Sequence, residues 1–492
     1  MTNAPEIVWG KEDDVNMQLA HPFVGILGIG TAVPPHLLDQ KETARRLAAA
    51  LEKHKEASRW VRLVFRQMGV ESRYTCEPNL LEAPERCRYT AETPIERIPA
   101  TTERMEIFRR EAVPLALAAA GSALKDSGIE AGQITHLITV SCTGMFLPGL
   151  DVMVAERLDL GKQVVRVPLT FLGCAAGLTA IRMAKNIAEQ DRNAKVLIVC
   201  VELCTLHIQP TVDKEDLFAA AFFGDGAGAC VVGAVEGGRT AHFFGLGPAR
   251  AAILPGTSDD MVWNIGEHGF RLRLSPRIPE RIGSMVPPEI QRFWPDYEET
   301  APGFWVIHPG GRGIIDALQN VLRLTDEDTR ASREVLRKFG NMSSATILFV
   351  LDEMRKELAE RKHNGAQCDG LALAFGPGMQ AEMLRMTYVP AKRFSHGRDD
   401  DAVSRSRFGH DDETDAETDK VRVTIGIPSA SRACSSADAA QVKRRKSDRL
   451  PAAFSVRKSD EEDADARERG TVAPVNTSAN RASAPGEGVA ER

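Results

Sequence analysis

The chain has 492 residues, of which 43% are hydrophobic and 26% are charged, and its formal net charge is −6. This length can bury one large core or two fused cores, and the weakly acidic balance argues against a nucleic-acid surface. The polar N-terminus is no secretory signal, and no apolar run reaches membrane length. The chain has nine cysteines, and no two of them have the close spacing of a metal-binding knuckle or a redox CxxC motif. We therefore expect a cytosolic, reduced, soluble protein with no nucleic-acid partner, membrane insertion or metal.

Strands and helices alternate along the first half of the chain. Apolar, β-branched runs indicate strands, and apolar residues every three to four positions indicate helices. The expected elements are, in order, strand 23–29, helices 40–53, 58–68 and 101–126, strand 136–141, helix 151–158, strand 164–171, helix 175–183 and strand 195–204. Strand 164–171 is expected to be buried, because its residues are mainly apolar.

Cys174 lies on the turn between strand 164–171 and helix 175–183. The free N–H groups and the dipole of a helix N-terminus stabilise an anion there, which favours thiolate over thiol. A cysteine on such a turn is suited to hold an acyl group as a thioester. The alternative is a small apolar cysteine packed under the helix.

The second half repeats this alternation after a linker at 233–238. The glycine-rich segment 222–229 runs directly into a strand, which excludes a dinucleotide-binding loop and favours close backbone approach beside a site. His308 ends strand 305–307 and precedes helix 314–324. Asn341 lies at another junction before a helix. The remaining elements are helix 332–339, a helix to about residue 357, strand 370–375, a turn at 376–378 and strand 380–389.

Residues 393–492 have a different composition, rich in Arg, Asp, Glu, Ser and Ala. Such a segment cannot bury a core, so we expect a disordered tail with a short strand-like patch at 421–427. The basic run at 443–446 is compatible with a nuclear or anionic-surface address, although a solvated tail explains it as well. The predicted division is therefore 1–235, 236–392 and 393–492.

Four separated motifs together resemble the chalcone synthase superfamily, the type III polyketide synthases, over about residues 23–390. They are GCAAG around Cys174, HPGG from His308, GNMSSA around Asn341 and AFGPG at 374–378. The resemblance implies an α/β, thiolase-like fold of two similar halves in five layers, and a homodimer. It also implies that Cys174, His308 and Asn341 form a catalytic triad.

The same resemblance implies repeated decarboxylative condensation of malonyl-CoA onto an acyl-CoA starter held on Cys174. The CoA thioesters are substrates, and no cofactor is required. Two donors, His308 Nε2 and the Asn341 amide, suit one enolate oxygen. Segment 256–263 resembles alkylpyrone and alkylresorcinol synthases, which implies a fatty acyl starter. Alternatives are a malonyl-CoA-only phloroglucinol or tetrahydroxynaphthalene synthase, a ketoacyl-acyl carrier protein synthase III that condenses once, and an inactive scaffold.

Further substrate-binding positions carry over from the family one at a time. They are the gatekeepers Phe223 and Phe270, the pocket residues Cys142, Thr143 and Cys204, Leu147, which reaches into the partner subunit, and the loop residues Gly376, Pro377 and Gly378. The segments around Cys142 and Cys204 resemble bacterial members, and Ala374 replaces the first glycine of the usual loop. Arg62 and Arg66, four residues apart on helix 58–68, are expected to hold CoA phosphates. They do not align cleanly with the family's cations, and a solvated helix face explains their spacing equally well.

Overall fold

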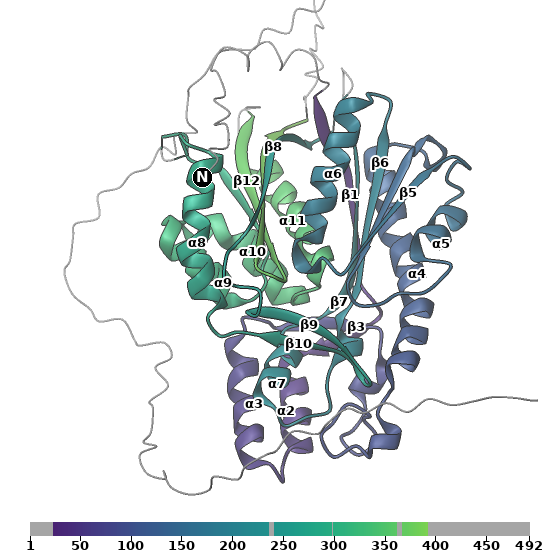
Figure 1. The fold of residues 1–492 in the computed structure, drawn as a ribbon, viewed down its shortest axis with the longest axis vertical. Coiled ribbons are helices and arrows are strands. Elements are labelled where there is room, and N and C mark those ends of the chain that lie inside the picture. The colour runs from purple at the N-terminus through teal and green to yellow at the C-terminus, as the bar shows by residue number, and fades with distance from the viewer. Residues whose placement is uncertain (1–22, 236–240, 298, 362–366, 392–492) are drawn as a thin grey trace, which may run out of the picture. The chain divides into compact units, whose positions relative to one another are not determined.

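The computed structural model describes residues 23–235, 241–297, 299–361 and 367–391 (Figure 1). The tail expected from residue 393 and the second half of the linker expected at 233–238 lie outside these residues. In the described part, a large mixed sheet is covered by helices on both faces, which confirms the predicted α/β class.

Nine strands form one sheet in the order β11-β12-β13-β8-β1-β7-β6-β4-β5. Their bounds are β1 (Val24–Ala32), β4 (His136–Ser141), β5 (Val165–Thr170), β6 (Lys195–Leu203), β7 (Asp225–Ala234), β8 (Phe243–Ile253), β11 (Phe304–Ile307), β12 (Cys368–Gly376) and β13 (Gln380–Val389). Two smaller sheets join β2 (His36–Asp39) to β3 (Ser72–Thr75) and β9 (Met261–Gly266) to β10 (Gly269–Leu274).

The large sheet contains the same strand pattern twice. In the first half, β1 pairs antiparallel with β7, β7 antiparallel with β6, and β6 parallel with β4. In the second half, β8, β13, β12 and β11 repeat these three pairings in the same order. The halves meet where β1 pairs with β8. The predicted pair of similar halves is therefore confirmed.

Most of the helices in the described residues pack in three layers around the two halves of the sheet, whereas α2, α3 and α7 form a separate cluster beside them (Figure 1). Their bounds are α2 (Gln40–Ala50), α3 (Lys55–Gln67), α4 (Thr101–Ser127), α5 (Leu150–Arg157), α6 (Ala176–Gln190), α7 (Lys214–Ala220), α8 (Ile278–Phe293), α9 (Arg312–Leu322), α10 (Asp326–Phe339) and α11 (Thr346–Glu360). One apolar core joins α6 and α11 to both halves, a second joins α4 and α5 to the first half, and a third joins α8 and α9 to the second half. The result is the predicted αβαβα order of five layers.

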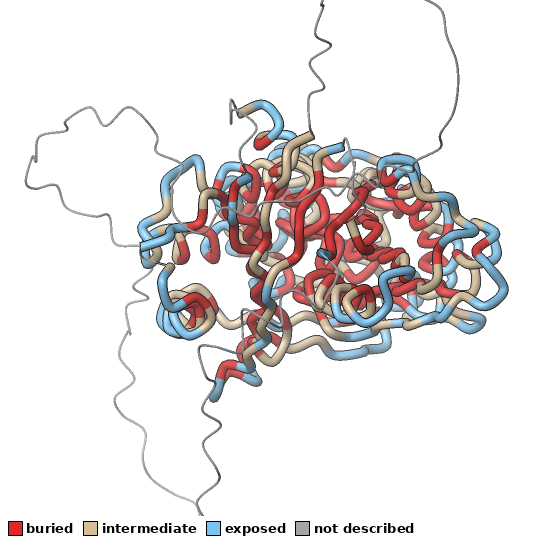
Figure 2. Tube along the Cα trace, turned by 90° about the horizontal axis from the view of Figure 1, so that it is seen from above, coloured by how far each residue is buried: buried red, intermediate tan, exposed pale blue. Residues whose placement is uncertain are grey.

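The buried segments lie in this layered body, with exposed turns around it (Figure 2). The central α6 and α11 are buried along much of their length because they pack between the two halves of the sheet. Helix α4 ends where the sequence predicts: Gly128 takes the left-handed conformation, with φ of 72°, and caps the helix.

Strand β5 differs from its prediction. The apolar run was expected to be buried, but β5 is the last strand of the sheet and most of its residues are exposed or half-exposed in the single chain. Pro168 lies within it, and a proline, which has no N–H to donate, is typical of an edge strand. The hydrophobic run therefore indicates an unpaired edge rather than a core strand.

The region between residues 239 and 304, where the sequence predicts no element, contains β8, β9, β10 and α8. Helix α8 carries Pro287 and Pro288 in its interior, which hides its helical pattern. Helix α10 also begins six residues earlier than expected, because Thr325 and Asp328 form a capping box ahead of it.

Candidate active site

A cavity of about 190 Å³ brings Cys174, His308 and Asn341 together. Each of the three follows or precedes an element of the central layers: Cys174 precedes α6, His308 follows β11, and Asn341 follows α10. The wall is mainly apolar, and includes Phe171, Phe223, Met261, Trp263, Leu272 and Phe375. Cys174 thus converges on one hydrophobic space with two residues that lie 134 and 167 positions later in the sequence.

Cys174 lies in a one-turn 3-10 segment, Gly173–Ala175, directly before α6. Gly173 has φ of 70°, which side-chain-bearing residues rarely adopt, and a Cβ there would lie 1.9 Å from Pro377 Cδ. The turn therefore needs glycine for two reasons, and the Gly376-Pro377-Gly378 loop presses against it. Burial raises the pKa of the Cys174 thiol to about 11.

His308 is held by its backbone at the end of β11, where its N–H donates to the carbonyl of Leu373 at 2.8 Å. Neither ring nitrogen has a hydrogen-bond partner among the described residues, so both remain available to a substrate. Burial lowers the pKa of His308 to about 3. A buried imidazole that lacks a protein partner is neutral at rest and can accept a proton.

Asn341 has a fixed side-chain orientation. Its Oδ1 accepts hydrogen bonds from the Ser343 N–H at 2.8 Å and the Thr346 hydroxyl at 3.3 Å. Its Nδ2 lies 3.9 Å from Cys174 Sγ and donates to the Gly310 carbonyl at 3.3 Å. Oδ1 lies 4.0 Å from the same sulfur, so both amide atoms are about equally close to Cys174, and Nδ2 is the one that can donate to a substrate oxygen there.

A buried carboxylate, Glu202, organises the opposite wall. It accepts hydrogen bonds from the Thr143 hydroxyl at 2.7 Å, from the Cys142 N–H at 3.0 Å and from the Ser344 hydroxyl. Cys142 Sγ in turn accepts from the Gly173 N–H at 2.9 Å. Burial raises the pKa of Glu202, and these donors oppose that shift. The network fixes Cys142 and Thr143 against the turn that carries Cys174.

Two family models match most of the described chain. Residues 11–236 match chalcone and stilbene synthases, N-terminal domain, and residues 246–390 match chalcone and stilbene synthases, C-terminal domain. The C-terminal type III polyketide synthase domain of Steely1, a type I/III hybrid from Dictyostelium, is similar at 28% identity and a TM-score of 0.68, covering 75% of this chain and 99% of that one. PKS-I of the brown alga Ectocarpus siliculosus is also similar, at 28% identity and a TM-score of 0.66. The match covers 75% of this chain and 99% of that one.

The chain is a type III polyketide synthase, a member of the chalcone and stilbene synthase family. It is therefore a transferase with a thiolase-like fold, as its motifs predict. The family match also decides against a ketoacyl-acyl carrier protein synthase III. The assignment covers the fold and the enzyme class, and leaves the starter, the product and the roles of single residues as proposals.

The structure places the other predicted site residues of this type III polyketide synthase at different depths. Phe223, Cys142, Thr143 and Pro377 line the cavity together with Cys174, His308 and Asn341. Four others lie outside the lining: Phe270, Cys204, Gly376 and Gly378. Their expected contact with substrate remains a prediction.

Phe270 is one layer behind the lining. It is 2% exposed, its ring stacks on His207 with centroids 4.2 Å apart, and it contacts the lining ring of Phe171. Cys204 is also buried behind the wall, in an apolar cluster with Phe222 and Phe223. Other side chains therefore separate both residues from the cavity.

The remaining predicted positions of the polyketide synthase are on its surface. Leu147 is 91% exposed and does not line the cavity of its own chain. Arg62 and Arg66 lie on the exposed face of α3, opposite the buried face that includes Val61 and Phe65. The structure thus leaves both arginines accessible, and their expected binding of CoA remains a prediction.

Two buried polar residues of the synthase were not identified as site residues from the sequence. Glu202 is the single charge inside the otherwise apolar part of β6, and this isolated charge was an available signal. His207 donates from Nε2 to the Thr143 carbonyl at 2.7 Å and accepts at Nδ1 from the Phe270 N–H at 2.9 Å. Burial lowers the pKa of His207 to about 3, so it is a neutral bridge between the two segments.

Several general properties of the synthase are visible in the described residues. None of the helices there combines the length and apolar character needed to cross a bilayer. Eight cysteines in those residues are free thiols. Nowhere in the described ranges do three or more His, Cys, Asp or Glu side chains gather as metal ligands.

Proposed function

We propose that this synthase condenses malonyl-CoA repeatedly onto an acyl-CoA starter held as a thioester on Cys174. The observation that carries the proposal is the shared cavity of Cys174, His308 and Asn341, with Asn341 Nδ2 3.9 Å from Cys174 Sγ. A nucleophile, a proton acceptor and a fixed amide donor are the groups that thioester condensation needs.

The first step is acylation of Cys174. The thiol proton moves to neutral His308, the thiolate attacks the carbonyl carbon of the acyl-CoA, and the bond from that carbon to the CoA sulfur breaks. CoA leaves as a thiol with the proton from His308. Burial opposes charging Cys174 or His308 alone, whereas proton transfer charges both together, so that their attraction and the α6 N-terminus stabilise the pair.

The second step is extension. Malonyl-CoA loses its carboxylate as CO₂, and the electron pair of the broken bond forms an enolate whose oxygen accepts hydrogen bonds from His308 and Asn341 Nδ2. The enolate carbon attacks the acyl thioester, which forms the new carbon–carbon bond and releases the Cys174 thiolate. Transfer of the lengthened chain from CoA back to Cys174 allows another round, and the finished chain then cyclises to an alkylpyrone, alkylresorcinol or phloroglucinol-type product.

The apolar wall supports a fatty acyl starter. The lining includes several large apolar or aromatic side chains near Cys174, among them Met261, Trp263 and Leu272 from β9 and β10. Such surface binds an alkyl chain by the hydrophobic effect, at roughly 0.8 kcal/mol per methylene group. Met261 and Trp263 belong to segment 256–263, whose sequence resembles the alkylpyrone and alkylresorcinol synthases.

The cavity volume favours a second candidate, a synthase that uses malonyl-CoA alone. About 190 Å³ is below the roughly 300–1,000 Å³ typical of pockets for drug-sized ligands. A short chain built only from malonyl units needs less space than a long alkyl starter. A fatty acyl starter therefore requires that the wall opens further when the chain enters.

The two candidates are separated by feeding purified protein malonyl-CoA with acyl-CoA starters of two to sixteen carbons and identifying products by mass. We expect products that retain the fatty acyl chain. The same product from every reaction, with no starter carbon in it, would support the malonyl-only alternative.

A folded Cys174→Ala variant should form no polyketide while it keeps slow malonyl-CoA decarboxylation, and normal yield from it would contradict the proposed nucleophile.

We further propose a cytosolic homodimer in which β5 lies at the interface. Val165 on this edge strand is 50% exposed, and Phe171 and Met145 nearby in the sequence are also exposed apolar residues. Free backbone groups on an edge strand pair readily with a second chain. In such a dimer, the exposed Leu147 is available to the partner's cavity. Arg62 and Arg66, exposed on α3, are available to the phosphates of CoA.

A further inference from the structure

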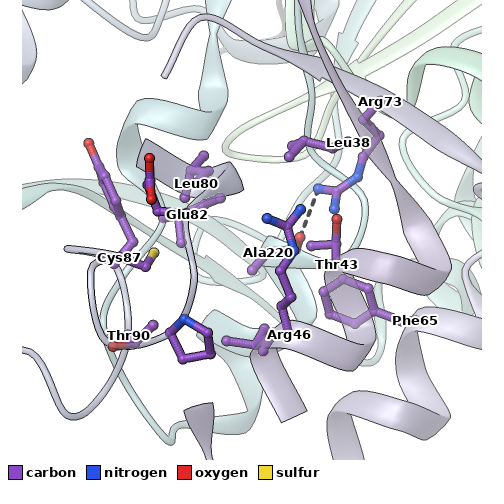
Figure 3. Close-up of a pocket in the computed structure, with 14 residues that line it drawn as sticks. Leu38, Thr43, Arg46, Phe65, Arg73, Leu80, Glu82, Cys87, Thr90 and Ala220 are labelled. Carbon is purple, nitrogen blue, oxygen red and sulfur yellow. Dashed lines mark hydrogen bonds between the residues drawn. The ribbon is translucent and has the colours of Figure 1, made fainter. Parts of the chain in front are cut away.

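A second cavity, separate from the site of Cys174, lies between α2, α3, β3 and the segment that follows β3 (Figure 3). Its volume is about 60 Å³, which leaves room for a ligand of a few non-hydrogen atoms. Leu38, Phe65, Leu80 and Ala220 contribute apolar wall. Two arginines, Arg46 and Arg73, extend from α2 and β3 toward the same space.

Arg73 is fully buried, with an exposed fraction of 0%. Its Nη1 donates to the carbonyls of Ala220 at 2.8 Å and Phe223 at 2.7 Å. Its Nε and Nη2 are buried without a hydrogen-bond partner among the described residues. These two nitrogens form one edge of the guanidinium, and their parallel N–H bonds fit the two oxygens of a carboxylate.

Within the described ranges, no carboxylate forms an ion pair with Arg73. Asp225 is the acidic group that favours its charged form, but Asp225 already accepts hydrogen bonds from Thr205 and from the Cys76 N–H. The Phe65 ring, 5.8 Å from the guanidinium carbon, adds a cation–π contact. Water in the cavity would satisfy the free N–H groups, but only an anion would also balance the buried charge.

Arg46 adds a second positive charge to the wall. It donates to the Leu81 carbonyl, and its Nε lies 3.4 Å from Glu42 Oε1. Glu82 is the carboxylate in the lining, and it pairs with Arg86 at 2.7 Å. The wall thus contains two arginines, Arg46 and Arg73, and its carboxylate, Glu82, is already paired with Arg86.

We propose that this cavity is a binding site for a short carboxylate or bicarbonate ion, held on two oxygens by Nε–H and Nη2–H of Arg73. The limited volume selects acetate-sized anions over larger acids. Bicarbonate suits the site chemically because it has the same planar pair of oxygens, and it forms from CO₂, which the proposed condensation releases. The binding site itself does not depend on that reaction.

The position of Arg73 connects this site to the candidate active site. A Cβ at Gly340 would lie 2.8 Å from Arg73 Cγ, and one at Gly224 would lie 3.3 Å from Arg73 Cβ, so the stem of the arginine supports both backbones. These two segments carry Asn341 and Phe223, which pair as a β-bridge. An anion that orders the guanidinium therefore also stabilises the wall of the larger cavity.

The test measures the unfolding temperature of the full chain while acetate replaces gluconate at constant sodium and ionic strength. Gluconate carries the same carboxylate but is too large for the cavity. We expect a saturable rise with acetate, and the same in a bicarbonate series, because a ligand that binds only the folded state stabilises it. Equal unfolding temperatures in all three salts would overturn the proposal.

Three variants locate the effect. Arg73→Gln removes the donor edge and should abolish the response to acetate. Because that change also affects the bonds to Ala220 and Phe223, Leu80→Phe provides a second test: it fills the cavity, keeps Arg73, and should abolish the response as well. Arg59→Gln, on the exposed face of α3, is the charge-matched control and should keep the full response.

Crystals grown in acetate give the direct readout. Planar density within hydrogen-bond distance of Arg73 Nε and Nη2, absent from crystals grown in gluconate, is the expected result. Density for water alone in both crystals would overturn the proposal, as would an acetate response that survives in Leu80→Phe.

Discussion

At the scale of single residues, the proposed oxyanion donor depends on which way the Asn341 amide faces. The Ser343 N–H and the Thr346 hydroxyl donate to its Oδ1, which lies 4.0 Å from Cys174 Sγ, while Nδ2 lies 3.9 Å from that sulfur. This arrangement separates the structural role of the side chain, carried by Oδ1, from the proposed chemical role, carried by Nδ2. Substitutions can therefore remove one role and keep the other.

Asn341→Asp should retain the acceptor for Ser343 and Thr346 while it loses the donor. We expect malonyl-CoA decarboxylation to fall on the order of a hundredfold or more, the usual cost of losing one oxyanion donor. The unfolding temperature and the reaction of Cys174 with iodoacetamide show whether the fold survives. Asn341→Ala removes both roles and should be less stable than Asn341→Asp. Unchanged decarboxylation in a folded Asn341→Asp variant would make Asn341 a structural residue.

The reactivity of Cys174 should depend on His308 and on pH. Burial alone raises the pKa of Cys174 to about 11, so without a proton acceptor the thiolate fraction rises about tenfold per pH unit between pH 7 and 10. We expect alkylation of the His308→Gln variant by iodoacetamide to show this steep rise. The unmodified protein should react much faster at pH 7 and change little up to pH 9, because proton transfer to His308 supplies the thiolate.

The measurement is the second-order alkylation rate across that pH range, with Cys174→Ala as the blank for other thiols. Superimposable profiles for the unmodified protein and His308→Gln would contradict the ion pair. The comparison isolates His308, because burial of Cys174 is the same in both proteins.

The sequence identifies the residues that end an element in a distinctive motif, and it is less informative about residues in the layer behind them. Cys174, His308 and Asn341 each occupy such a junction, and the structure brings all three to one cavity. Phe270 and Cys204 were assigned by motif as well, yet both lie behind other side chains. Which of two adjacent layers reaches a cavity depends on side-chain packing between distant segments, which a single sequence does not contain.

At the scale of elements, the turn before α6 is shaped by its contact with the loop after β12. Gly173 accommodates both the positive φ and the close approach of Pro377. The pairing explains why glycine and proline recur in two motifs that are about 200 residues apart. It also makes the turn sensitive to a single added methyl group.

Gly173→Ala should displace the turn, because its Cβ would overlap Pro377 and its φ is unfavourable for alanine. A shift of about 1 Å at a reacting group can cost on the order of a hundredfold in rate. We expect at least that loss in product formation, with a lower unfolding temperature. Gly121→Ala is the control: this glycine is inside α4 with nothing within 4 Å of the added Cβ, so it should keep activity and gain roughly 0.5–1 kcal/mol of stability. Full activity in Gly173→Ala would contradict the proposed rigidity of the turn.

Element types were predictable where periodicity was strong, as in α4 and β4, which begin where expected. Exposure was harder to predict than strand character for β5, because an apolar run looks the same in a sheet centre and at an edge that a second chain covers. Pro168 was the residue that distinguished the two cases. The prolines inside α8 had the opposite effect, because they concealed a real helix.

At the scale of the whole molecule, β5 is one of the two edge strands of the large sheet, and it leaves apolar side chains of the first half exposed in the single chain. β5 pairs with β4 on one side, and its exposed apolar side chains would be covered by a second copy. Two identical edge strands related by a two-fold axis can pair antiparallel. Two-fold symmetry is the commonest closed symmetry among soluble oligomers. Leu147, which is far more exposed than other large apolar residues nearby, then needs a partner to be buried.

Val165→Glu tests this assembly. Val165 is 50% exposed on β5, so glutamate is tolerated in a lone chain, where a surface change costs within about 0.5 kcal/mol. At a dimer interface, an unpaired charge would be buried and would weaken association by roughly tenfold or more. We expect a shift from dimer to monomer in sedimentation velocity without loss of the folded far-UV signal. Ile253→Glu introduces the same charge on β8, where Ile253 is 81% exposed, and should leave the dimer unchanged. If Val165→Glu remains dimeric at concentrations where Ile253→Glu is dimeric, the edge of β5 is not the contact, and Leu147 would have no route into a partner's cavity across this edge.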